Sequence, residues 1–223
     1  MPETPSISIR PEIPADIPAI YALNAAAFDR PAEAELIERL RAAGAVSLSH
    51  VAESDGILVG HALWTPVHVR AQRENKAAVA LGPIAVAPAW QGQGVGGTLI
   101  RAGLAALRTA GHQIVFVLGH SSYYPRFGFK PSQPFDITCG YDVPVEAFMV
   151  LPLTPAALTG LRGVVEYRPE FDGDTVAPKP SPWIQMGASL RSRYRADKWC
   201  LKQPQTPGKR IMAFASRCSS PTS

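Results

Sequence analysis

One stretch of the 223-residue chain constrains its fold more than any other. An apolar segment runs through a glycine-rich loop into a helical pattern, LGPIAVAPAWQGQGVGGTLI, residues 81–100. A helix leaves its first backbone N–H groups unpaired and carries a partial positive charge at that end. Glycines have no Cβ, so the backbone can come close to a ligand. The stretch therefore predicts an α/β fold with an anion site at the helix start, suited to a phosphate or pyrophosphate.

Several kinds of ligand compete for such a loop. A P-loop requires Gly-Lys-Ser or Gly-Lys-Thr, whereas this chain has Gly96-Gly97-Thr98. A dinucleotide fingerprint, G-x-G-x-x-G, is matched by Gly92, Gly94 and Gly97. However, five residues separate the strand from the first of these glycines, and the acid expected about 20 residues further on is missing. A glycine-rich helix start that merely packs tightly is the remaining alternative.

The charge of the surrounding segment favours a ligand with several phosphates. No Asp or Glu occurs between Glu74 and Asp136. The same interval holds five basic residues, which are Lys76, Arg101, Arg108, Arg126 and Lys130. A segment with bases and no acids attracts a ligand that carries several negative charges.

The hydrophobic pattern predicts alternating strands and helices along the rest of the chain. Expected strands are Ser6–Arg10, Val46–Glu53, Ile57–Val69, Ala77–Val86 and Ile114–Leu118, with a tight turn at Ser54-Asp55-Gly56 and a last strand pair within Phe135–Leu153. Expected helices are one capped by Asp16 with Ile17, Ile20, Tyr21, Asn24 and Phe28 on one face, one from Pro31 to Gly44, one that follows the glycine loop and ends at Gly111, and a short one over Tyr123–Phe127 closed by Gly128. This order predicts an α/β fold with a mixed, mostly antiparallel central sheet flanked by helices.

The composition changes after residue 174 to Pro, Ser, Lys and Arg without a sustained period. We therefore expect residues 1–174 to form one domain and residues 175–223 to form a disordered basic tail. The tail carries nine Lys or Arg and one acid, a net +8, which leaves 13 basic and 17 acidic residues, a net −4, before it. The overall charge of +4 is thus due to the tail. Nucleic-acid binding by the folded part is not expected.

Cysteine usage and hydropathy predict a cytoplasmic protein. Cys139, Cys200 and Cys218 lie too far apart for a disulfide framework or a zinc-ligand set, so no metal site is expected. The N-terminus lacks the basic and apolar regions of a secretory signal, and the longest apolar stretch, Ala77–Pro88, is too short to span a bilayer. The sequence leaves the oligomeric state open, a homodimer included.

Two motifs resemble those of the GNAT acetyltransferase superfamily. Gln91-x-x-Gly94-x-Gly96 is similar to its Q/R-x-x-G-x-G/A signature, and the apolar segment before it is similar to the cofactor strand of that family. The segment Tyr123–Phe129, YYPRFGF, resembles its Y-x-x-x-G-F element. The amino-acid sequence around both motifs is similar to that of the YhbS-like branch of this superfamily. The resemblance covers about residues 7–174 and implies a GNAT-type fold.

The resemblance also implies acetyl-CoA as the acyl donor. Its pyrophosphate would be bound by the backbone amides of Gly92, Gly94, Val95, Gly96, Gly97 and Thr98, and Gln91, the first residue of the motif, is counted with the same cofactor site. Ile84 and Val86 would hydrogen-bond the pantetheine arm through their main chain, where two parallel strands part. Members of this family let a primary amine attack the thioester directly. None of the cysteines of this chain stands in a nucleophile motif, which agrees with direct attack.

Two residues are candidates for proton transfer. Tyr124 stands four residues before Gly128, where the family has its proton donor to the departing thiolate. The alternative is an aromatic residue that packs against Phe127 and Phe129. His120 follows the strand Ile114–Leu118 and is a candidate base for the amine, with a hydrogen-bonded structural histidine as the alternative. His61 and His68 are expected to be half-buried or to face solvent.

Other functions stay open at this stage. A GNAT fold could serve as a non-catalytic acyl-CoA-binding or regulatory module, because a fold and a cofactor site do not guarantee turnover. A nucleic-acid-associated acetyltransferase recruited by the basic tail is another alternative. The amine acceptor is not specified by the sequence. Glu33 and Glu35, in the first turn of the second helix, either border the acceptor site or compensate the helix dipole.

Overall fold

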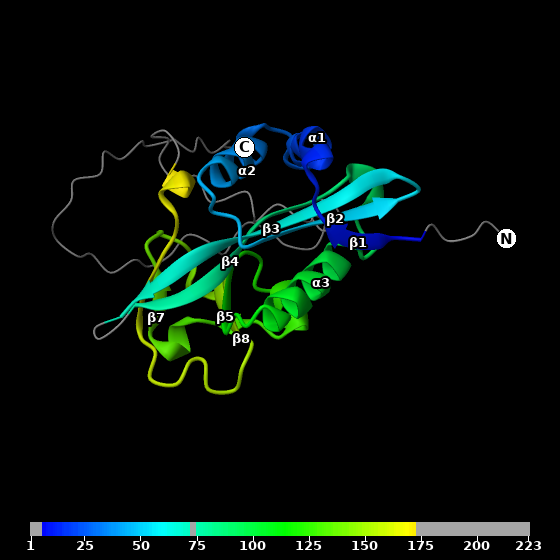
Figure 1. Cartoon of the computed structure of the whole chain (residues 1–223). Coiled ribbons are helices and arrows are strands. Elements are labelled where there is room, and N and C mark those ends of the chain that lie inside the picture. Colours follow the sequence, from blue (N-terminus) through cyan, green and yellow to red (C-terminus); the bar gives the residue numbers. More distant parts are fainter. Residues whose placement is uncertain (1–5, 72–74, 173–223) are drawn as a thin grey trace, which may run out of the picture. The chain divides into compact units, whose positions relative to one another are not determined.

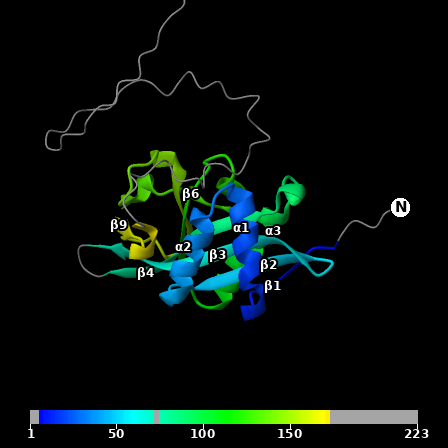
Figure 2. The ribbon, with the colours of Figure 1, turned by 90° about the horizontal axis from the view of Figure 1, so that it is seen from above.

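The computed structural model describes residues 6–71 and 75–172, and its central feature is a nine-stranded sheet (Figure 1, Figure 2). The strands are β1 (Ser8–Pro11), β2 (Leu48–Ser54), β3 (Ile57–Arg70), β4 (Lys76–Val86), β5 (Ile114–Leu118), β6 (Lys130–Pro131), β7 (Ile137–Cys139), β8 (Phe148–Pro152) and β9 (Gly163–Glu166). The α-helices in this part of the chain are α1 (Ile17–Phe28), α2 (Ala32–Ala42) and α3 (Val95–Thr109). The tail expected over residues 175–223 lies outside the described residues.

The sheet is mixed and mostly antiparallel. Its order is β1-β2-β3-β4-β5-β8-β6, and neighbours in this order are antiparallel except β4 and β5, which are parallel. Helix α3 makes the crossover that two parallel neighbours require. In addition, β9 pairs antiparallel with the end of β3, and β7 pairs in parallel with β9. The predicted fold class is confirmed.

Helices cover both faces of the sheet. Figure 1 shows α1 and α2 on one face and α3 on the other. Under α1 and α2 lies an apolar cluster around Ile20, Ile37 and Leu63, and under α3 lies a second one that includes Leu99. A third cluster gathers around Phe116 of β5, with residues from β3, β4, β7, β8 and β9. No helix in the described part is long and apolar enough to cross a membrane.

The hairpin between β2 and β3 forms as the sequence predicts. Ser54 pairs with Ile57, so the connecting loop consists of Asp55 and Gly56 alone. Both loop residues have positive φ, at +50° and +77°. A two-residue turn with positive φ at both positions matches the twist of the flanking strands, and Asp-Gly is a favoured pair there.

Two expectations about local structure are wrong. Residues 135–153 do not contain a strand pair, because β8 is flanked on its two edges by β5 and β6 while β7 pairs with β9. Asp16 precedes α1 but its side chain does not cap that helix. The carboxylate instead accepts hydrogen bonds from the Arg10 guanidinium at 2.6 and 3.0 Å and from the Ile13 N–H at 2.8 Å. The charged fork of Arg10 is the stronger donor, so Asp16 joins β1 to the start of α1.

Helix α3 and the sheet approach each other closely at a buried tryptophan. Trp64, on β3, is fully buried, and a Cβ built on Gly103 of α3 would lie 2.1 Å from two carbons of its indole ring. A second close approach lies nearby, where a Cβ on Gly60 of β3 would be 2.9 Å from Leu99 and 3.0 Å from Val95. Glycines on both sides of this interface therefore set the separation between helix and sheet.

We expect Gly103→Ala to destabilise the protein. The added methyl group overpacks the Trp64 contact, which should lower the free energy of unfolding by roughly 1–3 kcal/mol, or about 2–4 °C in Tm per kcal/mol. Thermal and denaturant unfolding measure the effect. Gly97→Ala is the matched control, because a Cβ there would keep ordinary distances of 3.4 Å to Arg101 and 3.7 Å to Phe127. Equal stability of the two variants would contradict the packing argument.

Candidate functional site

The glycine loop leads from the end of β4 through a short 3-10 turn, η2 (Pro88–Trp90), into α3. Gly92 and Gly94 have φ values of +77° and +88°, in the left-handed region that favours glycine. A Cβ at either position would meet no atom within 4 Å. These two glycines are therefore required by the backbone conformation and not by crowding, and the space beside them is open.

Free backbone donors line this turn. Within the described chain, the N–H groups from Gly92 to Gly97 donate to no other protein group. They belong to the loop and to the first turn of α3, where intrahelical acceptors do not exist. Consecutive free N–H groups at a helix start form an anion site. The predicted residues Gly92, Gly94, Val95, Gly96 and Gly97 are thus brought together in one turn.

Gln91 and Thr98 differ from the residues between them. The side-chain amide of Gln91 donates to the Val86 carbonyl at 3.1 Å and so ties the loop back to the end of β4. The N–H of Thr98 donates to the Gly94 carbonyl at 3.0 Å, and the Thr98 hydroxyl contacts the same carbonyl at 3.3 Å. Gln91 therefore shapes the turn through its side chain, and the run of free amides ends before Thr98.

The parallel strands β4 and β5 part next to this turn. They pair only at Val79 with Val115 and at Ala80 with Phe116. Beyond these pairs β4 continues to Val86 and β5 to Leu118, with no pairing between them. On the far sides of the opening β4 still pairs with β3, and β5 with β8. The sheet therefore contains a wedge-shaped opening with an unpaired strand edge along β4.

The backbone of Ile84 and Val86 faces this opening. The Ala87 N–H donates to the Val59 carbonyl at 2.9 Å, and Ala85 lies opposite His61 in the same ladder. Because hydrogen-bonded and non-bonded pairs alternate in an antiparallel ladder, Ala85 directs its N–H and C=O toward β3. Ile84 and Val86 then direct theirs away from β3, toward the opening.

Tyr124 lies at the end of β5, in the 3-10 turn η3 (Tyr124–Phe127) that Gly128 closes with a φ of +93°. Its ring packs against Gly119, where a Cβ would lie 2.3 Å from the ring. The side chain is 4% exposed, and its hydroxyl forms no hydrogen bond within the described chain. Burial raises its pKa, so the phenol stays protonated at neutral pH. Tyr124 is both a packed aromatic residue and a neutral hydroxyl group without a protein partner.

His120 lies between β5 and Tyr124 and is half-buried. Its carbonyl accepts hydrogen bonds from the N–H groups of Tyr123 and Tyr124, at 3.0 and 3.4 Å. Its imidazole has no hydrogen-bond partner among residues 6–71 and 75–172, so the alternative of a hydrogen-bonded structural histidine finds no partner there. Burial lowers the pKa of His120, which favours the neutral ring.

The glycine turn, His120 and Tyr124 lie at the same end of two neighbouring strands. The glycine turn follows the carboxyl end of β4, and His120 and Tyr124 follow the carboxyl end of β5. Because β4 and β5 are parallel neighbours, both ends lie on the same side. Phe127 of η3 lies beside the first turn of α3, at 3.7 Å from the Cβ position of Gly97. An anion site, an open strand edge and a buried phenol are thus assembled around the parting of β4 and β5.

Comparison with known proteins identifies the family. Residues 8–132 match the family model described as "Acetyltransferase (GNAT) domain". The chain is 38% identical over 165 residues to the uncharacterized N-acetyltransferase YhbS of Escherichia coli K12, which covers 74% of this chain and 98% of that protein. This chain belongs to the GNAT acetyltransferase family. The GNAT chain is also 39% identical over 153 residues to the uncharacterized N-acetyltransferase YjhQ of Escherichia coli K12, covering 65% and 84% of the two chains.

Solved structures of relatives have the same fold. The crystal structure of Escherichia coli YhbS in complex with CoA matches with a TM-score of 0.74 and 35% identity, over 80% of this GNAT chain and 99% of that one. A GNAT acetyltransferase from Brucella melitensis in complex with acetyl-CoA matches with a TM-score of 0.63 and 38% identity, over 76% and 100% of the two chains. The resemblance to the YhbS-like branch is confirmed, and the protein is an N-acetyltransferase of the GNAT family.

A buried histidine of this acetyltransferase was not expected from the sequence. His61 is 0% exposed, so its predicted half-buried or solvent-facing position is wrong. The Asn24 side-chain amide of α1 lies 3.2 Å from His61 Nδ1, and the Ser49 hydroxyl lies 2.9 Å from Nε2. An amide nitrogen can only donate, so Nε2 carries the proton and donates to Ser49. Ser49 in turn donates to the carboxylate of Glu12. The same carboxylate accepts two hydrogen bonds of 3.1 Å from the Arg41 guanidinium of α2.

This polar network fixes the protonation states of its members. Burial lowers the pKa of His61 and keeps the ring neutral. Burial raises the pKa of Glu12, but hydrogen bonds from His61, Arg41 and Ser49 outweigh it and bring the value down to about 2. The network joins α1 and α2 to β3 directly beside β4, because His61 pairs with Ala85. Its partners come from separate elements, so strand alternation alone gave no sign of it.

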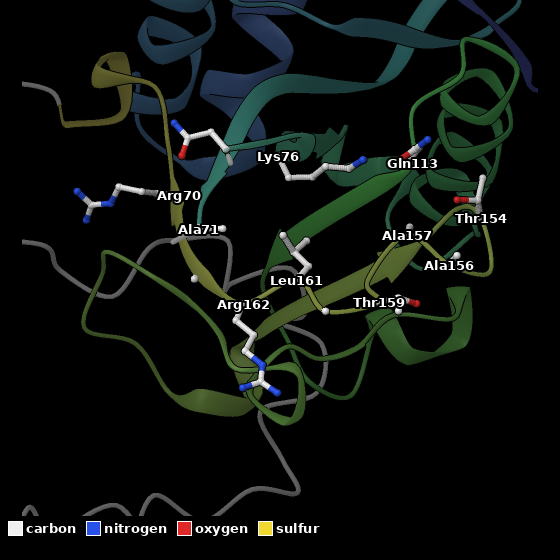
Figure 3. Close-up of a pocket in the computed structure, with 13 residues that line it drawn as sticks. Arg70, Ala71, Lys76, Gln113, Thr154, Ala156, Ala157, Thr159, Leu161 and Arg162 are labelled. Atoms are coloured by element: carbon white, nitrogen blue, oxygen red, sulfur yellow. The ribbon is translucent and has the colours of Figure 1, made fainter. Parts of the chain in front are cut away.

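A hollow of about 710 Å³ lies at the opposite end of β4 from the glycine turn (Figure 3). Its lining comes from the ends of β3 and β4, from Gln113 and from the segment 154–163. In Figure 3 Lys76 extends toward Gln113, whereas Arg70 and Arg162 point away. None of the predicted site residues lines it. The hollow is therefore separate from the candidate site, and no group of three or more His, Cys, Asp or Glu side chains in the described part is arranged to hold a metal ion.

We expect His61 to make the stability of the protein depend on pH. Unfolded histidine titrates near about 6.5, whereas the folded protein keeps His61 neutral to lower pH. The unfolded chain therefore binds the extra proton, and the stability present above about pH 6.5 is lost as the pH falls, by at most about 1.4 kcal/mol per pH unit. Denaturant unfolding from about pH 7.5 to 5.5 should show a smaller slope for His61→Gln than for the unchanged protein.

The exposed His68 of the same strand provides the control for this measurement. His68→Gln should leave the slope of stability against pH as it is in the unchanged protein. An identical slope in His61→Gln would show that the buried network does not exclude a proton from His61.

Proposed function

We propose that this GNAT enzyme transfers an acetyl group from acetyl-CoA to a primary amine by direct attack on the thioester. The observation that carries the proposal is the opening between β4 and β5. The free amides of the glycine turn follow the carboxyl end of β4, and Tyr124 follows the carboxyl end of β5 on the same side. An opening of this kind can admit a long thioester arm and leave its acyl end accessible to a second substrate.

The donor would be held mainly by backbone groups. The free N–H groups of Gly92, Gly94, Val95, Gly96 and Gly97 suit a pyrophosphate. Thr98 would belong to the same site as a residue of the first helical turn, whose N–H donates to the Gly94 carbonyl. Ile84 and Val86 suit the amides of a pantetheine arm, which would add to the open edge of β4 as a strand does. Gln91 would act by holding the turn closed. The relatives crystallised with CoA and with acetyl-CoA support this choice of donor.

The chemistry would need only an amine, a proton acceptor and a proton donor. The amine nitrogen attacks the thioester carbon, the tetrahedral centre collapses, the carbon–sulfur bond breaks and CoA leaves as a thiolate. Tyr124 would give that thiolate its proton, because burial keeps the phenol protonated and its hydroxyl has no protein partner in the described chain. His120 would take the proton lost by the amine, directly or through water, since its ring is held neutral.

A thiol-release assay with a panel of primary amines tests the proposal. The panel contains polyamines, amino acids, peptides with free N-termini and a lysine-containing protein, each with acetyl-CoA. Amine-dependent release of CoA that is matched by formation of an acetylated amine supports the reaction. Tight binding of acetyl-CoA without turnover on any member of the panel would instead support a non-catalytic acyl-CoA-binding module.

Tyr124→Phe should lower the turnover rate on an active amine by at least about tenfold, because general acid catalysis is typically worth about 10²–10⁴ and a thiolate partly leaves unaided. The ring and its packing against Gly119 remain, so acetyl-CoA affinity and Tm should stay near those of the unchanged enzyme. Steady-state kinetics, calorimetry and thermal unfolding measure the three quantities. Undiminished turnover would remove Tyr124 from the proton-transfer step.

Gly94→Glu should weaken acetyl-CoA binding by at least about tenfold relative to Gly94→Asn. Both variants place a side chain at a φ of +88°, and neither would meet a protein atom within 4 Å of its Cβ. Asn tolerates this backbone conformation, whereas Glu adds a negative charge next to the pyrophosphate. Calorimetric titration of both variants measures the difference, and equal affinities would contradict the assignment of the anion site.

A further inference from the structure

Two arginines near the glycine turn lie over aromatic rings. The guanidinium of Arg101, on α3, lies 5.3 Å from the ring centre of Phe127, and that of Arg126 lies 4.6 Å from the ring centre of Tyr123. The two rings contact each other at 5.4 Å in an edge-to-face arrangement. We call Arg101, Phe127, Tyr123 and Arg126 the arginine–aromatic stack.

The two cations of this stack have no acidic partner. Within the described residues neither Arg101 nor Arg126 forms an ion pair, although most other arginines there do. The sequence from Glu74 to Asp136 contains no acid that could provide one. A guanidinium that lies on an aromatic ring keeps its N–H edge free for a planar or tetrahedral anion. Two such edges are therefore available beside the Tyr123–Phe127 ring pair, and the charges of both arginines act on the Tyr123 hydroxyl.

The stack adjoins the amides that we assign to the pyrophosphate. Arg101 follows Gly97 by one helical turn, and its Nη1 lies 3.4 Å from the Cβ position of Gly97. Phe127 lies 3.7 Å from the same position. An anion held by the first turn of α3 would thus have Arg101 as its nearest cation on that helix, with Arg126 next along the stack.

The charge of CoA exceeds what the turn can compensate. A helix start supplies the equivalent of about half a positive charge, whereas CoA carries a pyrophosphate and a separate 3′-phosphate with a charge of about −1.5 to −2. We propose that Arg101 and Arg126 bind the 3′-phosphate of the donor. The enzyme would then select free acyl-CoA over acyl groups carried on a bare phosphopantetheine arm. This inference rests on the proposed function, because it assigns a second contact to the same donor.

Phe127 and Tyr123 would act as positioning residues in this arrangement. Arginine loses rotational freedom when it grips a phosphate, and an aromatic ring that already orients the guanidinium reduces that loss. The rings also join η3 to α3, so both arginines move with the turn.

Calorimetric titration with CoA and with dephospho-CoA, which lacks only the 3′-phosphate, tests the proposal. The variants are Arg101→Gln, Arg126→Gln and the double variant. Arg39→Gln is the control, because it removes one charge from α2 on the opposite face of the sheet. We expect the unchanged enzyme to prefer CoA by about tenfold or more. Each single variant should lose about threefold to tenfold in affinity for CoA and less than about twofold for dephospho-CoA.

The outcomes separate this inference from the proposed function. A double variant that no longer distinguishes the two ligands, with the control unchanged and Tm retained, supports it, as does a preference for CoA that shrinks as salt is raised. Equal losses for both ligands would overturn it, because the arginines would then act on the pyrophosphate. Equal affinities of the unchanged enzyme for both ligands would overturn it while leaving CoA binding intact. Failure of both ligands to bind the unchanged enzyme would contradict the proposed function itself.

Discussion

The contact between Trp64 and Gly103 determines where helix α3 lies on the sheet. The indole ring occupies the space that any side chain at position 103 would need, and Gly60 repeats the close approach beneath Val95 and Leu99. A helix held at this separation has a fixed N-terminus, and that N-terminus carries the free amides of the glycine turn. The proposed donor site would thus depend on packing in the core, because the direction of these main-chain N–H groups is set by the position of the whole helix.

The candidate site divides its work between main chain and side chains. In the proposed function the donor would be held by backbone groups, namely the turn amides and the open edge of β4, while the chemistry would fall to Tyr124 and His120 beside the end of β5. Backbone N–H and C=O groups are present in almost every residue, so they can bind a shared ligand even where the surrounding side chains differ between relatives. The polar network of His61, Asn24 and Glu12 meanwhile joins α1 to β3, the antiparallel neighbour of β4.

The sequence predicted those features that depend on local signals. The strands before residue 119, the Asp55–Gly56 hairpin and the left-handed glycines of the turn follow from alternation, turn chemistry and missing side chains. Features that depend on distant partners could not be predicted in this way. The carboxylate of Asp16 accepts hydrogen bonds from Arg10 of another element, and β7 pairs with a strand that follows it by more than 20 residues. His61 contacts Asn24 of α1 and Ser49 of β2. The assigned roles of Tyr124 and His120 remain predictions.

The parting of β4 and β5 also bears on how the protein avoids aggregation. An unpaired strand edge is a template for the strand of another chain, and proteins usually protect such edges. Here the edge of β4 lies inside the sheet, between neighbours that stay paired at Val79 and Ala80 and diverge only beyond them. An intruding strand would need about 4.8 Å to each neighbour along its whole length, which a wedge cannot offer near its apex. A narrow ligand arm can enter where a foreign polypeptide cannot extend, so the same geometry that leaves the edge open for a small molecule shelters it from other proteins.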